Sequence, residues 1–67
     1  MKVTKVYEVW VGGDMIADGL TLDQAILEAT KEFKSELEEH PSDPADVVVD
    51  EHSYITIESF EDLDKLG

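Results

Sequence analysis

The sequence predicts a small α+β fold in the order ββαββ, with a four-stranded mixed sheet, one helix across one face of the sheet and a short C-terminal helix. Three observations predict it: a glycine pair between two strand-like runs, one long amphipathic segment, and a second group of strand-like runs after two prolines. We expect residues 1–67 to form one domain, because a chain of this length supplies a single thin core.

The first hairpin is predicted from residues 3 to 18. Residues 3–11 are rich in β-branched and aromatic side chains, and Gly12-Gly13 then supplies two positions that tolerate the positive φ of a two-residue hairpin turn. Residues 14–18 should return antiparallel to the first strand. The residues expected to lie opposite one another are Val11 and Asp14, Trp10 and Met15, and Val9 and Ile16.

A helix is predicted from Thr21 to about residue 39. Thr21 and Gln24 have the spacing of a capping box, in which each side chain bonds the backbone N–H of the other residue. Apolar residues then recur at intervals of three and four, as on one buried helix face: Leu22, Ala25, Ile26, Ala29, Phe33 and Leu37. Because Phe33 is the largest of them, we expect Phe33→Ala to cost about 3–5 kcal/mol.

The second half is predicted to hold a second hairpin. Pro41 and Pro44 end the helix, and residues 47–49 and 54–57 read as two strands joined by a turn near residues 51–52. A right-handed crossover would place the first and fourth strands parallel in the centre of the sheet. This architecture is β-grasp-like and is similar to the immunoglobulin-binding domains of streptococcal protein G. A short helix is expected to begin at Ser59 and to align Phe60, Leu63 and Leu66.

The run YEVWVGG at residues 7–13 carries a sequence resemblance. Together with Leu20-Thr21-Leu22, the Ala-containing amphipathic helix and the strand at residues 46–49, it resembles small uncharacterised proteins of phages and prophages of Gram-positive bacteria. The resemblance covers residues 1–50 and implies a phage origin, but it brings no catalytic residues. The carboxylate-rich tail after Asp50 departs from that group.

The charge of the chain restricts its partners. Seventeen Asp and Glu oppose five Lys, giving a net charge of -12, and residues 35–64 contain eleven carboxylates and no basic residue. Such a surface repels nucleic acid and anionic membranes and attracts basic proteins. The leading interpretation is a small non-catalytic binding protein, a phage-encoded inhibitor that mimics DNA and occupies the basic, nucleic-acid-binding surface of a host protein. The competing interpretation is that the acidity serves solubility alone.

The carboxylates that we expect to face a basic partner are Glu36, Glu38, Glu39, Asp43, Glu51, Glu61 and Asp62.

A second candidate surface is the open face of the sheet. If the odd-numbered residues of the first strand lie under the helix with Ile16, Ile55 and Ile57, then the open face carries Val6, Trp10, Met15 and Tyr54. An exposed aromatic cluster is typical of a protein interface, and it predicts as the alternative function a structural module that forms a homodimer or larger assembly through this face. In the reverse parity, Trp10 belongs to the core.

Other chemistry is not expected. His40 and His52 are the only histidines, and although Glu36 and His40 share one helix face, they fall short of a metal site, so we predict no metal and no cofactor. No serine has a His-acid partner at a recognisable spacing, and no thiol is present, so we predict no enzyme activity. Without disulfides or a long apolar run, the expected location is the cytoplasm, of the host cell if the protein is phage-encoded.

Overall fold

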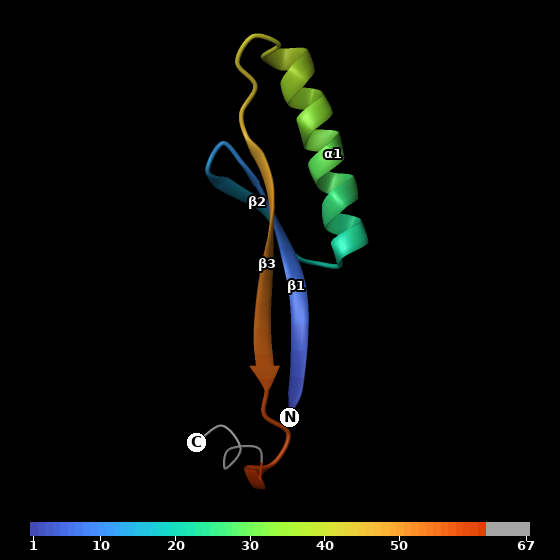
Figure 1. The fold of residues 1–67 in the computed structure, drawn as a ribbon, viewed down its shortest axis with the longest axis vertical. Coiled ribbons are helices and arrows are strands. Elements are labelled where there is room, and N and C mark those ends of the chain that lie inside the picture. Colours follow the sequence, from blue (N-terminus) through green and yellow to red (C-terminus); the bar gives the residue numbers. More distant parts are fainter. Residues whose placement is uncertain (62–67) are drawn as a thin grey trace.

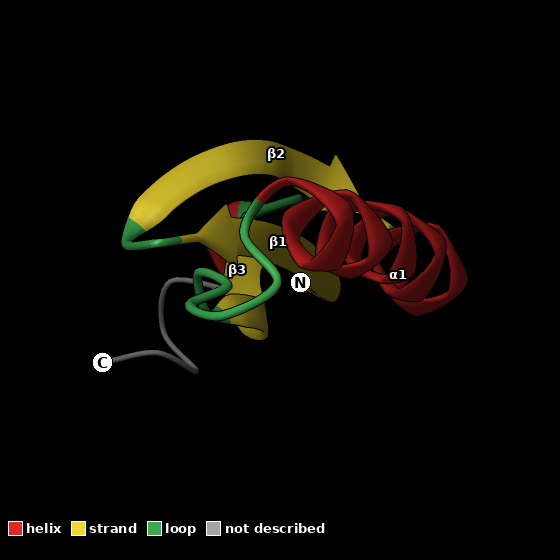
Figure 2. Cartoon of the chain, turned by 90° about the horizontal axis from the view of Figure 1, so that it is seen from above, coloured by secondary structure: helices red, strands yellow, loops and turns green. Residues whose placement is uncertain are grey.

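The computed structural model describes residues 1–61 of the chain. The elements follow the order ββαβ: β1 (Lys2–Val11), β2 (Asp14–Leu20), α1 (Leu22–Glu39) and β3 (Val47–Thr56). The three strands form one antiparallel sheet in the order β2-β1-β3, and α1 lies along one side of it (Figures 1 and 2). The α+β class, the first hairpin and the helix are therefore confirmed.

The predicted second hairpin is wrong. Residues 47–56 form one continuous strand that pairs antiparallel with the whole of β1, from Val11 opposite Val47 to Lys2 opposite Thr56. A two-residue hairpin turn needs positive φ, and no non-glycine residue described here adopts it. Residues 50–53 contain no glycine, so the ten-residue β1 holds them extended as a partner strand.

The sheet consequently differs from the β-grasp prediction. No fourth strand and no parallel pair exist within residues 1–61, and the centre is occupied by β1 alone. The likeness to the protein G domains is lost with the fourth strand. The short helix predicted from Ser59 falls mostly on residues 62–67, which lie outside the described residues.

The register of the first hairpin matches the prediction only near the turn. Trp10 lies opposite Met15 and Val11 opposite Asp14, as expected, but Val9 lies opposite Ala17 rather than Ile16. The register shifts between Val9 and Trp10, so Ile16 is an extra residue of the kind found in a β-bulge. The hydrophobic pattern did not reveal this shift because Ile16 and Ala17 are both apolar.

The helix begins as predicted. The Thr21 hydroxyl accepts a 3.2 Å hydrogen bond from the Gln24 N–H, and the Gln24 side chain accepts a 3.0 Å bond from the Thr21 N–H. Both halves of the capping box are therefore formed.

The core is much smaller than expected. Within residues 1–61, only Val9 on β1 and Ala25 on α1 are fully buried hydrophobic residues. Because Val9 is buried, its face of β1 lies under the helix, and Trp10 lies on the opposite face. This resolves the parity that the sequence left open.

The large residues of the predicted helix face are only half covered. We call them the apolar stripe, and their exposed fractions are 46% for Leu22, 49% for Ile26, 48% for Phe33 and 43% for Leu37. The small Ala25 is buried and Ala29 is half-buried, so the helix approaches the sheet through its alanines. Phe33 is therefore not the centre of a closed core, which corrects the prediction for Phe33→Ala.

One half of the β1–β3 ribbon projects beyond the rest of the molecule. Strand β2 pairs with β1 only from Tyr7 to Val11, so residues 2–6 and 52–56 form a two-stranded arm past β2 and α1 (Figure 1). The molecule measures 55 × 19 × 11 Å, and its radius of gyration is 16.6 Å. A compact chain of this length would have a radius of about 11 Å.

Candidate binding surfaces

The predicted acidic residues fall into separate groups. Those from the end of α1 and the loop after it gather at the end of the molecule opposite the arm (Figure 1). We call this group the acidic end, and it consists of the predicted residues Glu36, Glu38, Glu39 and Asp43 together with Asp46, which is not among the predicted residues.

Local hydrogen bonds position the acidic end. The His40 N–H donates a 2.8 Å bond to the Glu36 carbonyl, and the Ala45 N–H donates a 3.1 Å bond to Oε1 of the Glu36 side chain. The loop is further tied to the first hairpin, because the Gly12 N–H donates to the Asp46 carbonyl. Glu36 therefore has a structural role, whereas Glu38, Glu39 and Asp43 are exposed to solvent.

The charge of the acidic end is uncompensated within the described residues. The last turn of α1 contains no basic residue, and neither ion pair found within residues 1–61 includes a carboxylate of this group. The C-terminus of a helix carries a partial negative charge of its own, so Glu38 and Glu39 reinforce it. The result is a concentration of negative charge on an exposed end of the molecule.

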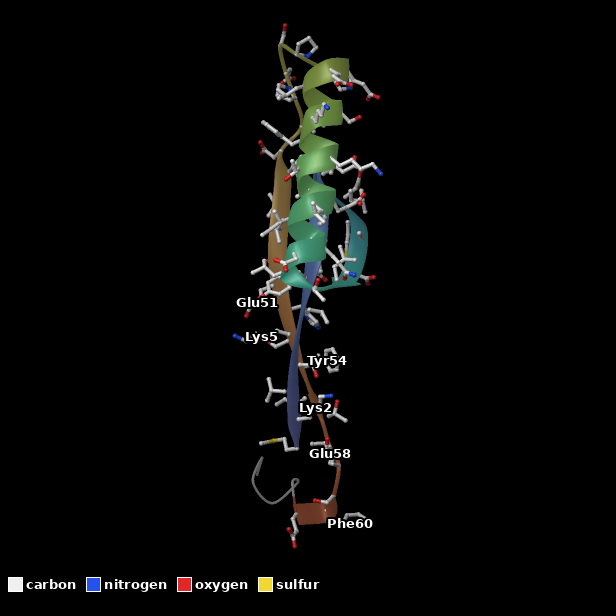
Figure 3. The ribbon with its side chains drawn as sticks, turned by 90° about the vertical axis from the view of Figure 1, so that its right-hand side faces the viewer. Lys2, Lys5, Glu51, Tyr54, Glu58 and Phe60 are labelled. Carbon is white, nitrogen blue, oxygen red and sulfur yellow. The ribbon has the colours of Figure 1, made fainter. Side chains whose placement is uncertain are left out.

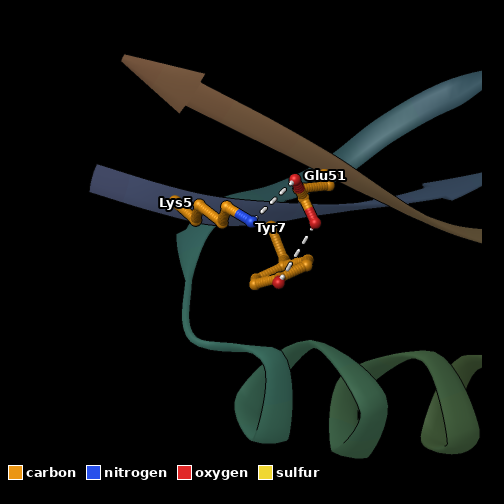
Figure 4. A network of polar contacts seen from close by, with 3 residues as sticks. All are labelled: Lys5, Tyr7 and Glu51. Carbon is orange, nitrogen blue, oxygen red and sulfur yellow. Dashed lines mark hydrogen bonds and ion pairs between the residues drawn. The ribbon is translucent and has the colours of Figure 1, made fainter. Parts of the chain in front are cut away.

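Glu51 lies elsewhere, in the middle of β3. Its Oε1 is 3.8 Å from Lys5 Nζ, and its Oε2 accepts a 3.4 Å hydrogen bond from the Tyr7 hydroxyl (Figure 4). Both contacts are long and solvent-exposed, so they contribute little to stability. They nevertheless neutralise part of the Glu51 charge, which separates it from the acidic end in environment as well as in position.

Glu61 and Asp62, the two remaining carboxylates predicted to face a partner, are not part of the acidic end. Glu61 belongs to the segment after β3, which lies beyond the arm, at the far end of the molecule from the C-terminus of α1 (Figure 1). Asp62 lies outside the described residues. Nearby Glu58 is 3.5 Å from the N-terminal amino group.

The four residues predicted for the open face share that face but are spread along it. Trp10 lies opposite Met15 on β2 and Val48 on β3, while Tyr54 lies opposite Thr4 on the arm. Six residue steps along β1 separate Trp10 from Thr4, which is about 20 Å. Trp10 is half-buried, and Met15 and Tyr54 are 46% and 47% exposed. The face therefore holds two small apolar groups, with Val6 between them, rather than one aromatic cluster.

Three side chains that can ligate a metal lie together at the end of α1, and they include Glu36 and His40. One ligand atom from each of Glu36, Glu39 and His40 lies within 4.8 Å of the others. The Glu36 carboxylate is already bonded to the Ala45 N–H, and the other two side chains are exposed. Exposed groups of this kind are common without an ion, so the prediction of no metal stands as a prediction.

Open depressions occur among the described residues, and two of them are candidate sites. One lies at residues 57–60, and the other is a groove between β2 and α1 lined by Ala17, Leu20, Gln24, Leu27, Glu28 and Lys31. Neither brings two carboxylates together in an enclosed space, as acid–base catalysis by a carboxylate pair requires. Sequence reasoning missed the exposed arm, which follows from the shortness of β2 relative to β1. It also missed the half-covered apolar stripe, because periodicity does not say how much of a helix face the sheet covers.

Comparison with protein-family models, with curated proteins and with solved structures finds no match. The resemblance to phage proteins therefore stays a prediction. Within residues 1–61, no helix combines the length and the apolarity needed to cross a membrane.

Proposed function

We propose that this chain is a non-catalytic binding protein that uses its acidic end against a basic protein surface. The observation that carries the proposal is the unpaired negative charge of Glu38, Glu39 and Asp43 at a helix C-terminus. Glu38 and Glu39, in the last turn, each oppose the helix dipole by about 0.3–1 kcal/mol. Charge that lowers stability where it stands, on an exposed end of the molecule, favours a role in binding over a role in folding.

The partner class follows from charge density. Duplex DNA carries one negative charge per about 1.7 Å of its axis, and a protein that binds DNA presents Lys and Arg to match it. Five carboxylates on one helix end and its loop offer such a surface a competing anion. The proposed role is to occupy the nucleic-acid-binding surface of a basic protein, which makes the chain an inhibitor of that protein.

The experiment compares two variants with equal charge changes. The first replaces Glu38, Glu39 and Asp43 by Gln, Gln and Asn; the matched control replaces Asp18, Asp23 and Glu28 in the same way. Basic proteins are captured from a bacterial lysate at low salt, identified, and then measured for association with each variant. The acidic-end variant should associate about tenfold or more slowly than the wild type, because charge governs the on-rate, while the control changes little.

A second candidate function is self-assembly through the open sheet face. The exposure of Met15, Val48 and Tyr54 on that face favours it. This function needs no basic partner, and it would leave association with captured proteins unaffected by either set of substitutions.

A further inference from the structure

The outer edge of β3 has no partner strand among the described residues. In the order β2-β1-β3, no strand within residues 1–61 bonds the far side of this ten-residue strand. A free edge presents backbone N–H and C=O groups that can template another strand, and natural proteins cover or interrupt such edges. Neither proline nor glycine interrupts this edge between Val47 and Thr56.

The apolar stripe of α1 lies on the same side as this edge. The opposite flank of the helix lines the groove toward β2 through Gln24, Glu28 and Lys31. At about 100° per residue, the stripe is on the other flank of the line through Ala25 and Ala29. Since β2 and β3 are on opposite sides of β1, the stripe faces the β3 side.

The arm has an apolar face that no helix covers within the described residues. Its helix-side face carries Val3 and Ile55 opposite each other, 59% and 49% exposed, and Ile57 follows at 41%. Helix α1 begins beside Tyr7 and Glu51 and runs away from the arm, so nothing in the described chain covers this apolar face (Figures 1 and 4). A two-stranded ribbon without such cover is marginally stable in water.

We propose that the occupant of both surfaces is a second copy of this chain. Its β3 pairs antiparallel with the first β3 about a two-fold axis at His52, which extends the sheet to six strands. The stripe of each helix then lies over the arm of the other copy. One symmetric contact covers two surfaces that a single chain leaves open.

The strand composition selects this register. With His52 opposite itself, Val49 lies opposite Ile55 of the second copy and Asp50 lies opposite Tyr54, and opposed residues keep the same face. Moving the axis to Glu51 or to Asp50 would place that carboxylate directly opposite itself. The His52 register pairs residues 48–56, nine of the ten residues of β3.

The exposed area agrees with this occupant. The surface of the chain is 5134 Å² for a mass of 7.5 kDa. A compact monomer of that mass would expose about 4,200 Å², so the excess is about 900 Å². A standard protein interface removes about 800 Å² from each partner.

The charge distribution also permits self-association despite the net charge of -12. Residues 1–6 and 52–57 contain no carboxylate, and the arm carries Lys2 and Lys5 (Figure 3). The acidic ends lie far from the axis, at the two far ends of the dimer, where each comes near the end of the other copy's arm with Glu58 and Glu61. This inference does not depend on the proposed function.

The test uses the self-contact at residue 52. Sedimentation equilibrium of the full chain should give twice the 7.5 kDa mass at high micromolar concentration. The chain has no cysteine, so His52→Cys should oxidise to a disulfide-linked dimer without a background, because opposed strand residues are close enough for a disulfide. Ser42→Cys in the loop of the acidic end is the control and should stay reduced.

Charge complementation gives an independent readout. His52→Lys and His52→Glu should each raise the dimer dissociation constant about tenfold or more, since each puts like charges opposite one another on the axis. Mixing the two variants should restore a heterodimer. Circular dichroism of each variant verifies that it is folded, and the same pair of substitutions at Ser42 should leave the dimer intact.

A chain that stays at 7.5 kDa would overturn the proposal, including the case in which its own residues 62–67 cover the edge. A dimer that fails to crosslink through residue 52, and that tolerates both charge variants, would also overturn it and would favour contact through the open sheet face.

Discussion

The Gly12 N–H donates a 2.9 Å hydrogen bond to the Asp46 carbonyl, which joins the turn of the first hairpin to the loop that follows α1. This bond brings residues far apart in sequence to the base of the acidic end. Gly12 has a φ of 58°, and a Cβ built there would lie 3.4 Å from the Ala45 Cβ. The hairpin turn and the loop therefore constrain the same residue.

Gly12→Ala should lower the free energy of unfolding by about 1–2 kcal/mol, because a non-glycine residue is strained at this φ. Gly13→Ala is the matched variant: its φ is 87°, but a Cβ there would meet nothing within 4 Å. Urea denaturation should show a loss for both, with the larger one at Gly13, because its φ lies outside the left-handed region of about 50–70° and that of Gly12 lies inside it. A larger loss at Gly12 would show that the approach to Ala45 adds more strain than the backbone conformation does.

Val9→Ala and Phe33→Ala should reverse the order expected from side-chain size. Val9 is fully buried and Phe33 is 48% exposed. We expect Val9→Ala to cost about 2 kcal/mol and Phe33→Ala about 1–2 kcal/mol, below the 3–5 kcal/mol of a fully buried Phe.

Thermal and urea unfolding measure the stability of these two variants. Both are done at one low protein concentration, so that self-association does not contribute to the measured stability. Leu27→Ala, at a residue 72% exposed, is the control and should be nearly neutral. A Phe33→Ala protein that is unfolded under these conditions would show that the helix face is covered within the single chain.

Trp10 is the only tryptophan, so its fluorescence reports on the open face. The ring is half-buried opposite Met15 and Val48, and its Nε1 is 3.4 Å from the Glu8 Oε1. Because β3 lies between β1 and the second copy, pairing through the β3 edge should leave the Trp10 emission unchanged on dilution. A red shift on dilution would instead indicate assembly through the open face.

Neutralising the acidic end should raise stability. Glu38→Gln and Glu39→Gln remove negative charge from the C-terminus of α1, which should contribute about 0.3–1 kcal/mol each. Asp23→Asn at the N-terminal turn should have the opposite sign, since Asp23 is favourable there. Urea denaturation at low ionic strength tests the signs, and both effects should shrink in salt.

Local chemistry predicted the parts of the fold that depend on neighbouring residues. Gly12-Gly13 and the Thr21–Gln24 capping box are short-range signals, and both elements formed as expected. Whether residues 47–56 form a hairpin or one continuous strand depends instead on the length of β1, the strand with which they pair. A strand-like run with polar residues at 50–53 fits either a turn or a half-exposed strand, and pairing with β1 decides between them.

The same contrast between short-range signals and long-range pairing explains why only part of the acidic site was predicted. Glu36, Glu38, Glu39 and Asp43 are near in sequence on one helix end, so their grouping followed from the helix. Glu51 was grouped with them by composition alone, and its position depends on a register that pairs it with Tyr7. The half-covered stripe could not be foreseen, because a periodic apolar face does not say how much sheet lies beneath it.

The most direct test of the acidic end is competition with nucleic acid for a captured basic partner. The affinity of that partner for duplex DNA is measured with and without this protein, at about 50 mM and about 500 mM salt. The Debye length shortens severalfold between these two concentrations. The account predicts mutually exclusive binding at low salt, loss of inhibition at high salt, and no inhibition by the Glu38, Glu39 and Asp43 variant. A ternary complex in which the partner keeps its affinity for DNA would contradict it.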